Sequence, residues 1–390
     1  MASAIGEKAI EAALSTGKAI LKFVSRNDVG LTGGHQSGFF LPKSGWHIYS
    51  PYPPTKGENK KSWPRVVWQD GRITESCVTW YGTGTRSEYR LTKFGKGFPF
   101  LTADIVGDLL VLIPINHQEF RAYILDIDED IEEIQVALSV EITETYAIYD
   151  RGQVAIPESE DECIARNFRK FVELLSDYPK TQEFADGTRK TLEGCIKSFE
   201  KLTADERLRC LVDEEYTLFR MAERKITQPE VTRLFKDVDD FLATASTIMN
   251  RRKSRAGKSL ERHVENLFSS AGIPFDAQPK IDGNVQPDIL IPSRIAYVDD
   301  SYPADKLFVV GVKRTCKDRW RQVLNEAKRI PHKHILTLQP GISASQLYEM
   351  KNSNISLIVP KYLHKQYPRG TGISILTVED FIAHIQAVHS

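Results

Sequence analysis

Short apolar segments alternate with predicted helices in the second half of the chain, and this alternation constrains the fold most strongly. The segments are PDILIP, LFVVGVK, HILTL and SLIVP. Helices are predicted over 318–330 and 344–352, and a last helix begins near Thr377, with Asp380 as a possible capping partner. Short buried strands separated by helices are typical of a partly parallel sheet. We therefore expect an α/β domain with a mixed sheet.

The first third of the chain has the alternating pattern of strands instead. RVVWQDGRITESCVTWYG alternates apolar and polar residues around an Asp-Gly turn, which indicates a hairpin. DLLVLIPINHQEFRAYIL predicts two more strands that meet near Asn116 and His117. With SGFFL and YAIY added, and an amphipathic helix over EKAIEAALSTGKAILKFV, we expect a mostly-β barrel with flanking helices.

A polar segment separates the two patterns. DECIARNFRKFVELL predicts a helix, and SDYPKTQEFADG, which contains Pro179 and Gly187, follows it. A chain of 390 residues is long enough for two domains of ordinary size. We predict an N-terminal domain over 1–178, a linker over 179–187 and a C-terminal domain over 188–390.

Charge and cysteine content limit the class of protein. Lys and Arg together number 52, as do Asp and Glu, so a basic surface must come from local clustering. The sequence contains no apolar run of about 18 residues, so we expect no membrane span. The cysteines lack a spacing suited to zinc or to a redox motif, which indicates buried structural thiols in a reducing cytoplasm; they are Cys77, Cys163, Cys195, Cys210 and Cys316.

Three residues are candidates for catalysis. Asp288 precedes one predicted strand, Lys313 ends the next, and Glu326 falls within the helix that follows, beside its buried stripe. Two carboxylates near one point suit Mg²⁺, and a lysine beside them can orient or deprotonate water and stabilise phosphate charge. This set predicts hydrolysis of a phosphodiester, although a structural salt-bridge cluster explains the same residue types about equally well.

A basic run precedes the helix predicted over about 259–271. Its cations suit the DNA backbone at a helix N-terminus, although a solvated face is the alternative; they are Arg251, Arg252, Lys253, Arg255 and Lys258. Glu261 and Glu265 share one face of this helix. One of them is a candidate extra metal ligand, but such a pair is more often simply solvated.

Two clusters have the residue types that read G·C base pairs. Lys317, Asp318 and Arg319, with Arg321 nearby, combine donors for guanine with an acceptor for cytosine; capping of a helix by Asp318 is the alternative. In the first half, the residues that alternate on one strand face are Arg86, Glu88 and Arg90. Considered alone, this pattern is more often a solvent-facing row of salt bridges.

The quoted segments are similar to a known family. NRRKSRAGKSLE, PDILIP and VKRTCKDRWRQVLNEAKRI closely resemble the catalytic domain of the EcoRII-type restriction endonucleases, within the PD-(D/E)XK nucleases. The usual acidic residue two positions before Lys313 is replaced by Gly311, and the resemblance implies that Glu326 takes over its role. GLTGGHQSGFFLP and TRSEYRLTKFGKG resemble the family's N-terminal B3-like barrel. That resemblance implies effector-DNA contacts by His35, Arg86, Glu88 and Arg90.

The expected function is therefore a magnesium-dependent type II restriction endonuclease that acts on double-stranded DNA. Each active site cuts one strand, so a homodimer is expected. The resemblance implies a CC…GG kind of site, a second copy of the site that relieves autoinhibition, and a cognate DNA methyltransferase. A non-cleaving DNA-binding regulator and a structure-specific repair nuclease are the alternatives. The intact catalytic set argues against the first, and the base-reading clusters argue against the second.

Overall fold

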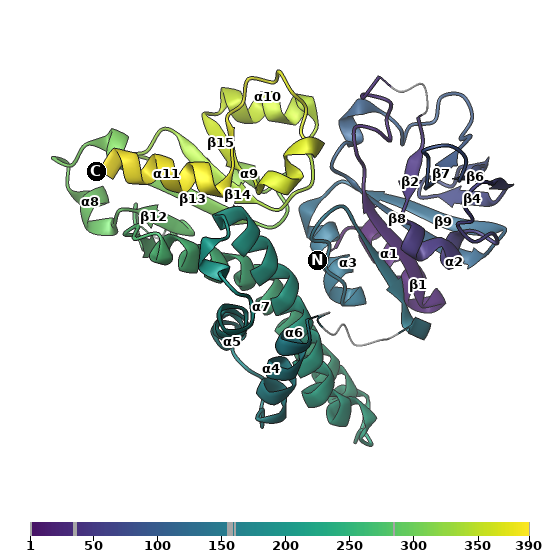
Figure 1. The fold of residues 1–390 in the computed structure, drawn as a ribbon, viewed down its shortest axis with the longest axis horizontal. Helices are drawn as coiled ribbons and strands as arrows, with labels where there is room; N and C mark the ends of the chain where they lie inside the picture. The colour runs from purple at the N-terminus through teal and green to yellow at the C-terminus, as the bar shows by residue number, and fades with distance from the viewer. Residues whose placement is uncertain (1, 34–36, 154–158, 160, 284, 390) are drawn as a thin grey trace. The chain divides into compact units, whose positions relative to one another are not determined.

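The structure is a computed structural model that describes residues 2–33, 37–153, 159, 161–283 and 285–389 (Figure 1). Two compact units make up the chain. The first consists of Met1–Val154 with Gln339–Glu349 and Lys365–Gly372, and the second consists of Ala155–Leu338, Met350–His364 and Ile373–Ser390. Within the described residues, no helix is both long and apolar enough to cross a membrane.

The first unit contains two sheets. Its described strands are β1 (Lys18–Phe23), β2 (Phe39–Leu41), β3 (Asn59–Ser62), β4 (Arg65–Trp68), β5 (Ile73–Glu75), β6 (Cys77–Tyr81), β7 (Glu88–Thr92), β8 (Leu109–Asn116), β9 (Glu119–Leu125) and β10 (Tyr146–Asp150). One sheet has the order β10-β1-β8-β9-β4-β5 and the other has the order β2-β7-β6-β3. The predicted barrel is therefore not confirmed, because the described strands form two open sheets that share one core. That core includes Ile20 and Phe120 of the first sheet and Phe39 and Trp80 of the second.

Both predicted hairpins are present in this unit. β4 and β5 pair antiparallel across the Asp-Gly turn, where Gly71 takes the left-handed φ of 83° that favours glycine. β8 and β9 pair from Leu109↔Leu125 to Asn116↔Glu119. The prediction of one N-terminal helix over the segment EKAIEAALSTGKAILKFV is wrong for its second half, which is a strand. Helix α1 (Ala4–Thr16) ends at Gly17, whose φ is 71°, and the apolar residues after it form β1.

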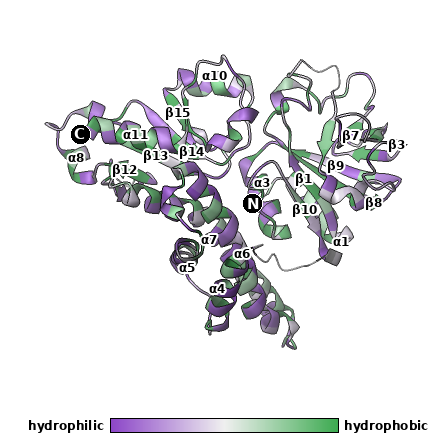
Figure 2. Cartoon of the chain, viewed as in Figure 1, coloured by the Kyte–Doolittle hydropathy of each residue, from purple (hydrophilic) through white to green (hydrophobic). Residues whose placement is uncertain are grey.

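The second unit begins with helices. They are α4 (Glu162–Glu173), α5 (Thr181–Cys195), α6 (Ala204–Thr232) and α7 (Val238–Ser270), while α2 (Trp46–Tyr49) and α3 (Asp128–Leu138) belong to the first unit. Green and purple segments alternate along α6 and α7 in Figure 2, as expected for helices with one buried stripe. The prediction of a linker over 179–187 is wrong, because α5 covers most of it. Glu183 accepts a hydrogen bond from the Lys180 N–H at 2.6 Å, and Phe184 is fully buried against α4 and α6.

Packing of α4 against α5 also changes the interpretation of the cysteines. Cys163 and Cys195 form a disulfide, with their Cα atoms 5.7 Å apart. The prediction that all the cysteines are thiols is therefore wrong for this pair. Cysteine spacing alone did not reveal the pair, because 32 residues separate the two positions along the chain and the packing of two helices brings them together.

A mixed sheet forms the core of the second unit, as predicted. Its order is β11 (Asp276–Ala277), β12 (Ile289–Ile291), β13 (Phe308–Lys313), β14 (Lys333–Thr337), β15 (Ile355–Ile358) and β16 (Ile375–Leu376). β11, β12 and β13 pair antiparallel, whereas β13 to β16 are parallel. One face packs on α7 and α11 (Val378–His389), where Phe268 and Phe381 are buried. The other described α-helices are α8 (Arg294–Val298) and α9 (Trp320–Val323) in this unit, and α10 (Ala344–Asn352), most of which belongs to the first unit.

The predicted capping of the last helix is present. The Asp380 N–H donates to the Thr377 hydroxyl at 2.9 Å, and the Thr377 N–H donates to the Asp380 carboxylate at 3.4 Å. Both bonds satisfy donors at the start of α11. The helix predicted over 318–330 is wrong in its length, because α9 ends at Val323 and the chain then turns. This change determines where Glu326 lies.

Candidate active site

Asp288 and Lys313 lie together at one edge of the mixed sheet. The antiparallel register pairs Ile289 with Val310, so Asp288 lies beside the end of β13. Lys313 Nζ is 2.7 Å from Asp288 Oδ2, and the Val312 N–H donates to the same oxygen at 2.7 Å. The two side chains are 17% and 13% exposed, respectively, so both are partly shielded from water. A fixed carboxylate and an ammonium therefore meet where the sequence predicts them.

Gly311 has a structural reason to lack a side chain. A Cβ at this position would lie 2.7 Å from Cγ2 of Val323, closer than real Cβ contacts come. Residues 311 and 313 share one face of β13, so Val323 occupies the space next to Lys313 where an acidic side chain would project. An acidic side chain at position 311 is therefore incompatible with the packing of Val323.

Glu326, which the resemblance implies as the substitute for that acid, lies in a turn and not in a helix. Ala327 after it has a φ of 46°, a left-handed value that reverses the chain. Burial and the charge of Asp288 raise the pKa of Glu326 to about 7, against the opposing effect of Lys313 and Lys333. Its Oε2 is buried and finds no hydrogen-bond partner among the described residues. Glu326 thus interacts electrostatically with Asp288 and Lys313, and one of its carboxylate oxygens has no described hydrogen-bond partner.

The two glutamates of α7 behave differently. Burial, and then the charge of Asp288, raise the pKa of Glu261 to about 6, so Glu261 belongs to the same electrostatic cluster. Its Oε2 also accepts a hydrogen bond from Gln278 at 3.0 Å. Glu265 instead pairs with Arg262 at 2.7 Å. The structure therefore brings Glu261, and not Glu265, to the candidate site.

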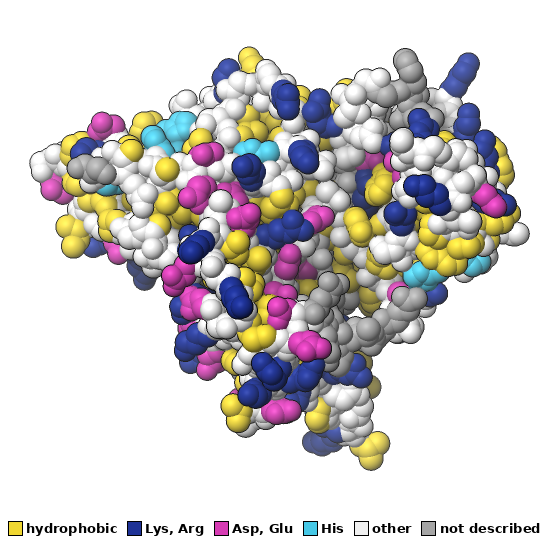
Figure 3. Space-filling view, viewed as in Figure 1, with side chains coloured by type: hydrophobic (Ala, Val, Ile, Leu, Met, Phe, Trp, Pro, Cys, Tyr) yellow, Lys and Arg dark blue, Asp and Glu magenta, His cyan; other side chains and the backbone are white. Residues whose placement is uncertain are grey.

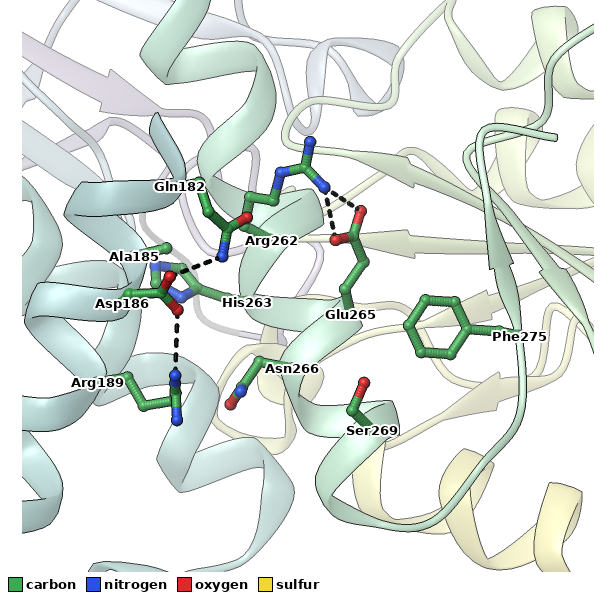
Figure 4. Close-up of a pocket in the computed structure, with 10 residues that line it drawn as sticks. All are labelled: Gln182, Ala185, Asp186, Arg189, Arg262, His263, Glu265, Asn266, Ser269 and Phe275. Atoms are coloured by element: carbon green, nitrogen blue, oxygen red, sulfur yellow. Dashed lines mark hydrogen bonds and ion pairs between the residues drawn. The ribbon is translucent and has the colours of Figure 1, made fainter. Parts of the chain in front are cut away.

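Arg262 and Glu265 line a separate polar cavity of about 190 Å³ between α5 and α7 (Figure 4). On the α5 side, Asp186 accepts hydrogen bonds from Gln182 and Arg189, both at 3.1 Å. The charged groups of the cavity thus pair within each wall, Asp186 with Arg189 on α5 and Arg262 with Glu265 on α7. We assign it no catalytic role.

The basic run at 251–258 lies in the middle of α7, so its predicted position at a helix N-terminus is wrong. Three of its cations pair with glutamates of α6. Arg251 is 2.9 Å from Glu230, Arg252 is 2.5 Å from Glu223, and Arg255 is 3.3 Å from Glu215. Cationic and anionic side chains are accordingly interspersed on the visible face of the helical region in Figure 3. These pairs join α6 to α7, whereas contacts of Lys253 and Lys258 with DNA stay a prediction.

Replacement of Glu215 by glutamine should destabilise this helix pair. Glu215 is fully buried and its Oε2 lies 2.9 Å from His263 Nε2. Burial raises the pKa of Glu215, but His263 and Arg255 outweigh that effect and lower it to about 2. Since removal of one partner leaves buried charge uncompensated, we expect a loss of about 3 kcal/mol in unfolding free energy at pH 7, measurable by urea denaturation.

The sign of the pH dependence gives the control for Glu215. A lowered carboxyl pKa stabilises the fold fully above the unfolded value near 4.5, and that contribution is lost as the pH falls towards about 2. The variant should therefore lose less stability than the parent chain on acidification. Equal acid sensitivity of the two proteins would contradict the assignment. Replacement of the exposed Glu200 by glutamine serves as the matched control.

The predicted base-reading cluster follows Lys313 along the chain. Lys317 is 3% exposed, Asp318 and Arg321 are exposed, and Arg319 is half-buried. The Arg321 guanidinium lies 4.4 Å from the centre of the Trp320 ring. Their contacts with bases stay a prediction, although the burial of Lys317 makes it the least accessible of the four.

The predicted effector residues do not share one strand face. Arg86 precedes β7 and lies over the Tyr81 ring at 5.3 Å, whereas Glu88 and Arg90 lie on the strand. Arg90 is 5% exposed, and its Nε donates to Glu88 at 3.0 Å. The two residues thus form an ion pair, but Arg90 is buried, so the pair is not the solvent-facing row of the alternative interpretation. His35 lies outside the described residues, and effector-DNA contacts by these positions stay a prediction.

Sequence reasoning missed one residue near Glu326. Lys333, the first residue of β14, is 4% exposed and donates to backbone carbonyls of the turn that carries Glu326. A lysine at the start of a strand that is buried throughout was the available signal.

The donor set of the site fits a hard divalent cation. Asp288, Glu326 and Glu261 offer carboxylate oxygens, and the buried Oε2 of Glu326 finds no protein partner in the described chain. Across the described ranges, no group of three or more His, Cys, Asp or Glu side chains is arranged to hold a metal ion. A Mg²⁺ site does not require three protein ligands, because proteins bind Mg²⁺ through one or two carboxylates together with waters and substrate phosphates.

Comparisons with known proteins cover both halves of the chain. Residues 219–382 match the family model described as EcoRII C terminal, and residues 14–149 match the restriction endonuclease EcoRII, N-terminal. The chain is 32% identical over 389 residues to type II restriction enzyme EcoRII from Escherichia coli, covering 95% of this chain and 94% of that one. It is 26% identical over 222 residues to type II restriction enzyme SsoII from Shigella sonnei, covering 53% and 69%, respectively.

Two solved structures are also similar in part. A restriction endonuclease PspGI–substrate DNA complex has a TM-score of 0.46 and 15% identity, covering 54% of this chain and 93% of that chain. Metal-depleted Ecl18kI in complex with uncleaved, modified DNA has a TM-score of 0.44 and 19% identity, covering 60% and 85%.

Proposed function

The chain belongs to the EcoRII family of type II restriction enzymes and is a site-specific deoxyribonuclease, and from this premise we propose how it cuts DNA. Asp288 and Glu326 bind Mg²⁺, with Glu261 as a further candidate ligand. Lys313 acts on the attacking water and the scissile phosphate. The observation that carries this proposal is the 2.7 Å contact between Lys313 and Asp288, beside the buried carboxylate of Glu326.

Each side chain has a separate part in the proposed reaction. Mg²⁺ would supply positive charge and Lewis acidity at the phosphate. Asp288 holds the Lys313 ammonium through Oδ2, and its carboxylate would also bind Mg²⁺. The Lys313 ammonium orients the attacking water and stabilises negative charge that grows on the phosphate oxygens. The half-buried position of the site strengthens these electrostatic interactions relative to those in water.

At the level of the whole chain, the proposal is an effector-stimulated enzyme. It acts in the cytoplasm as a homodimer on double-stranded DNA with a CC…GG kind of site. The N-terminal half binds a second copy of the site and so relieves autoinhibition, and a cognate methyltransferase protects host DNA. Lys317, Asp318 and Arg319 read the G·C pairs of the substrate, and Arg321 also contacts this DNA. In the first half, the effector-DNA contacts are His35, Arg86, Glu88 and Arg90.

Incubation of the full chain with Mg²⁺ and a plasmid library tests this function. Discrete fragments with a shared end sequence are expected, and addition of a short duplex that carries this sequence should accelerate cutting. Nicks at random positions or at branched DNA would instead favour a structure-specific nuclease. Sequence-specific binding without any cutting would identify a non-cleaving regulator.

Binding of Mg²⁺ should depend on pH even without DNA. The pKa values of Glu326 and Glu261 are raised to about 7 and about 6, so the metal-free fold loses stability as the pH rises from about 4.5 through 7. Mg²⁺ binds the deprotonated carboxylates. We therefore expect the Mg²⁺ concentration for half-maximal thermal stabilisation to be about tenfold higher at pH 6 than at pH 7. Differential scanning fluorimetry measures this shift.

The Glu326→Gln variant provides the control for the titration, because glutamine does not ionise. Its Mg²⁺ response should be weaker than that of the parent chain and less dependent on pH. Identical Mg²⁺ titrations of the parent chain at pH 6 and pH 8 would contradict the assignment of these carboxylates as ligands.

A further inference from the structure

The backbone of the turn that carries Glu326 accepts hydrogen bonds from a buried lysine, Lys333. Lys333 donates through Nζ to the backbone carbonyl oxygens of Glu326, of Ala327 at 2.7 Å and of Ile330 at 2.6 Å. Lys333 is the first residue of β14 and is 4% exposed. One ammonium has three donors, so these carbonyls account for its full hydrogen-bonding capacity.

The chain conformation creates the need for these donors. α9 ends at Val323, and the left-handed conformation of Ala327 turns the carbonyls away from any continuing helix. Ala327 and Ile330 are buried, so water is a poor substitute partner. Unsatisfied buried carbonyls are costly. Lys333 therefore makes this conformation of the turn possible.

The same turn is fixed from a second side. Asp282 accepts a hydrogen bond from the Lys328 N–H at 3.0 Å. The Arg329 guanidinium donates to the carbonyl oxygens of Tyr297 at 2.5 Å and Asp299 at 2.7 Å. Lys328 and Arg329 thus lie between Ala327 and Ile330, whose carbonyls Lys333 binds. Of all these anchors, Lys333 is the one that binds the backbone of Glu326 itself.

We propose that Lys333 is a positioning residue for cleavage, because it fixes the backbone of Glu326 so that this carboxylate faces Asp288 and Lys313. The inference rests on the role proposed above for Glu326. Lys333 itself does not touch the reacting atoms, since its donors are directed at main-chain carbonyls. The buried Lys333 ammonium also interacts electrostatically with the Glu326 carboxylate, and a neutral donor at this position would lack that positive charge.

Hydrogen exchange of the metal-free full chain tests the structural half of the inference. In Lys333→Met the amides of Glu326 and Ile330, which donate to Val323 at 3.1 Å and Ala327 at 2.9 Å, should exchange at least about tenfold faster. Lys328→Met removes the same charge from an exposed position of the same turn and should leave this exchange unchanged. Lys333→Gln, which retains a donor, serves if the methionine variant does not fold.

Single-turnover cleavage tests the functional half. Displacement of Glu326 should lower the cleavage rate about 100-fold and raise the Mg²⁺ concentration for half-maximal rate. DNA affinity measured by fluorescence anisotropy without Mg²⁺ should stay within about twofold, because Lys333 is buried. A folded variant with faster exchange but parental cleavage rate and Mg²⁺ dependence would overturn the inference, as would unchanged exchange.

Glu326→Gln separates failure of this inference from failure of the proposed function. If Glu326→Gln cuts DNA at the parental rate, the role of Glu326 is wrong, and the positioning role of Lys333 fails with it. If Glu326→Gln is inactive while a folded Lys333 variant cuts normally, only the inference about Lys333 is wrong.

Discussion

Replacement of Lys313 by alanine is expected to lower the rate of DNA cleavage by at least about 10³-fold, because both general acid–base help and electrostatic stabilisation of the phosphate are lost. Binding of DNA should change little, since Lys313 is one partly buried cation that Asp288 already neutralises at 2.7 Å. Single-turnover cleavage at saturating protein measures the first effect, and anisotropy with a labelled duplex measures the second.

Two further variants sharpen the test of Lys313. Lys306→Ala removes an exposed lysine just before β13 and should cut at the parental rate. Lys313→Arg keeps the charge, but its larger planar group cannot occupy the same position beside Asp288, so we expect it to restore little activity. Retained cutting by Lys313→Ala would remove this lysine from the mechanism. Circular dichroism shows whether Lys313→Ala is folded. If it is not, the test rests on the cleavage rate of Lys313→Arg.

The elements that sequence predicted well are those in which local pattern and tertiary packing agree. The strands of the mixed sheet are apolar runs, and an apolar run in a buried sheet satisfies both its backbone and its side chains. The hairpins of the first unit follow from alternation around turns. For the same reason the approach of Asp288 to Lys313 could be predicted, because both residues lie at ends of neighbouring strands.

The errors occur where a tertiary contact or an unusual backbone conformation overrides the local pattern. The stripe over 318–330 is compatible with one long helix, but Lys333 binds the carbonyls of the turn and Ala327 reverses the chain. The basic run at 251–258 fits a helix start only until its glutamate partners on α6 are known. The segment 179–187 contains a proline and a glycine, yet burial of Phe184 holds most of it in α5. Lys333 lies 3 to 7 residues from the carbonyls it binds, just outside the predicted helix, whereas the glutamates of α6 lie 21 to 40 residues from their arginines.

The replacement of a strand carboxylate by a turn carboxylate links the fold to the proposed chemistry. Val323 fills the space above Gly311, so an acidic side chain at 311 would require α9 to move. Since α9 packs there, the chain after it can bring Glu326 back to the Asp288–Lys313 pair within a few residues. Gly311, Val323 and Glu326 therefore form one arrangement. Restoration of the usual acid by Gly311→Asp should not rescue a Glu326→Gln variant, because the substituted strand and Val323 cannot both keep their positions.

Replacement of Asp288 by asparagine is expected to lower cleavage about 10³-fold or more, an effect comparable with that of Lys313. Asparagine can still accept the hydrogen bond from the Val312 N–H, so the strand register should survive. The variant loses the negative charge that holds Lys313 and would bind Mg²⁺. A loss of several kcal/mol in transition-state stabilisation corresponds to this effect on the cleavage rate.

The electrostatic interactions within the site add a second expected effect of Asp288→Asn, besides the loss of activity. The charge of Asp288 is one cause of the raised pKa values of Glu326 and Glu261. Its removal should therefore lower both values and weaken the pH dependence of stability between about pH 4.5 and 7 in the metal-free chain. Asp305→Asn removes an exposed aspartate and should leave both cleavage and this pH dependence unchanged. An Asp288→Asn variant that loses activity but keeps the parental pH profile would show that Asp288 does not share one electrostatic site with the two glutamates.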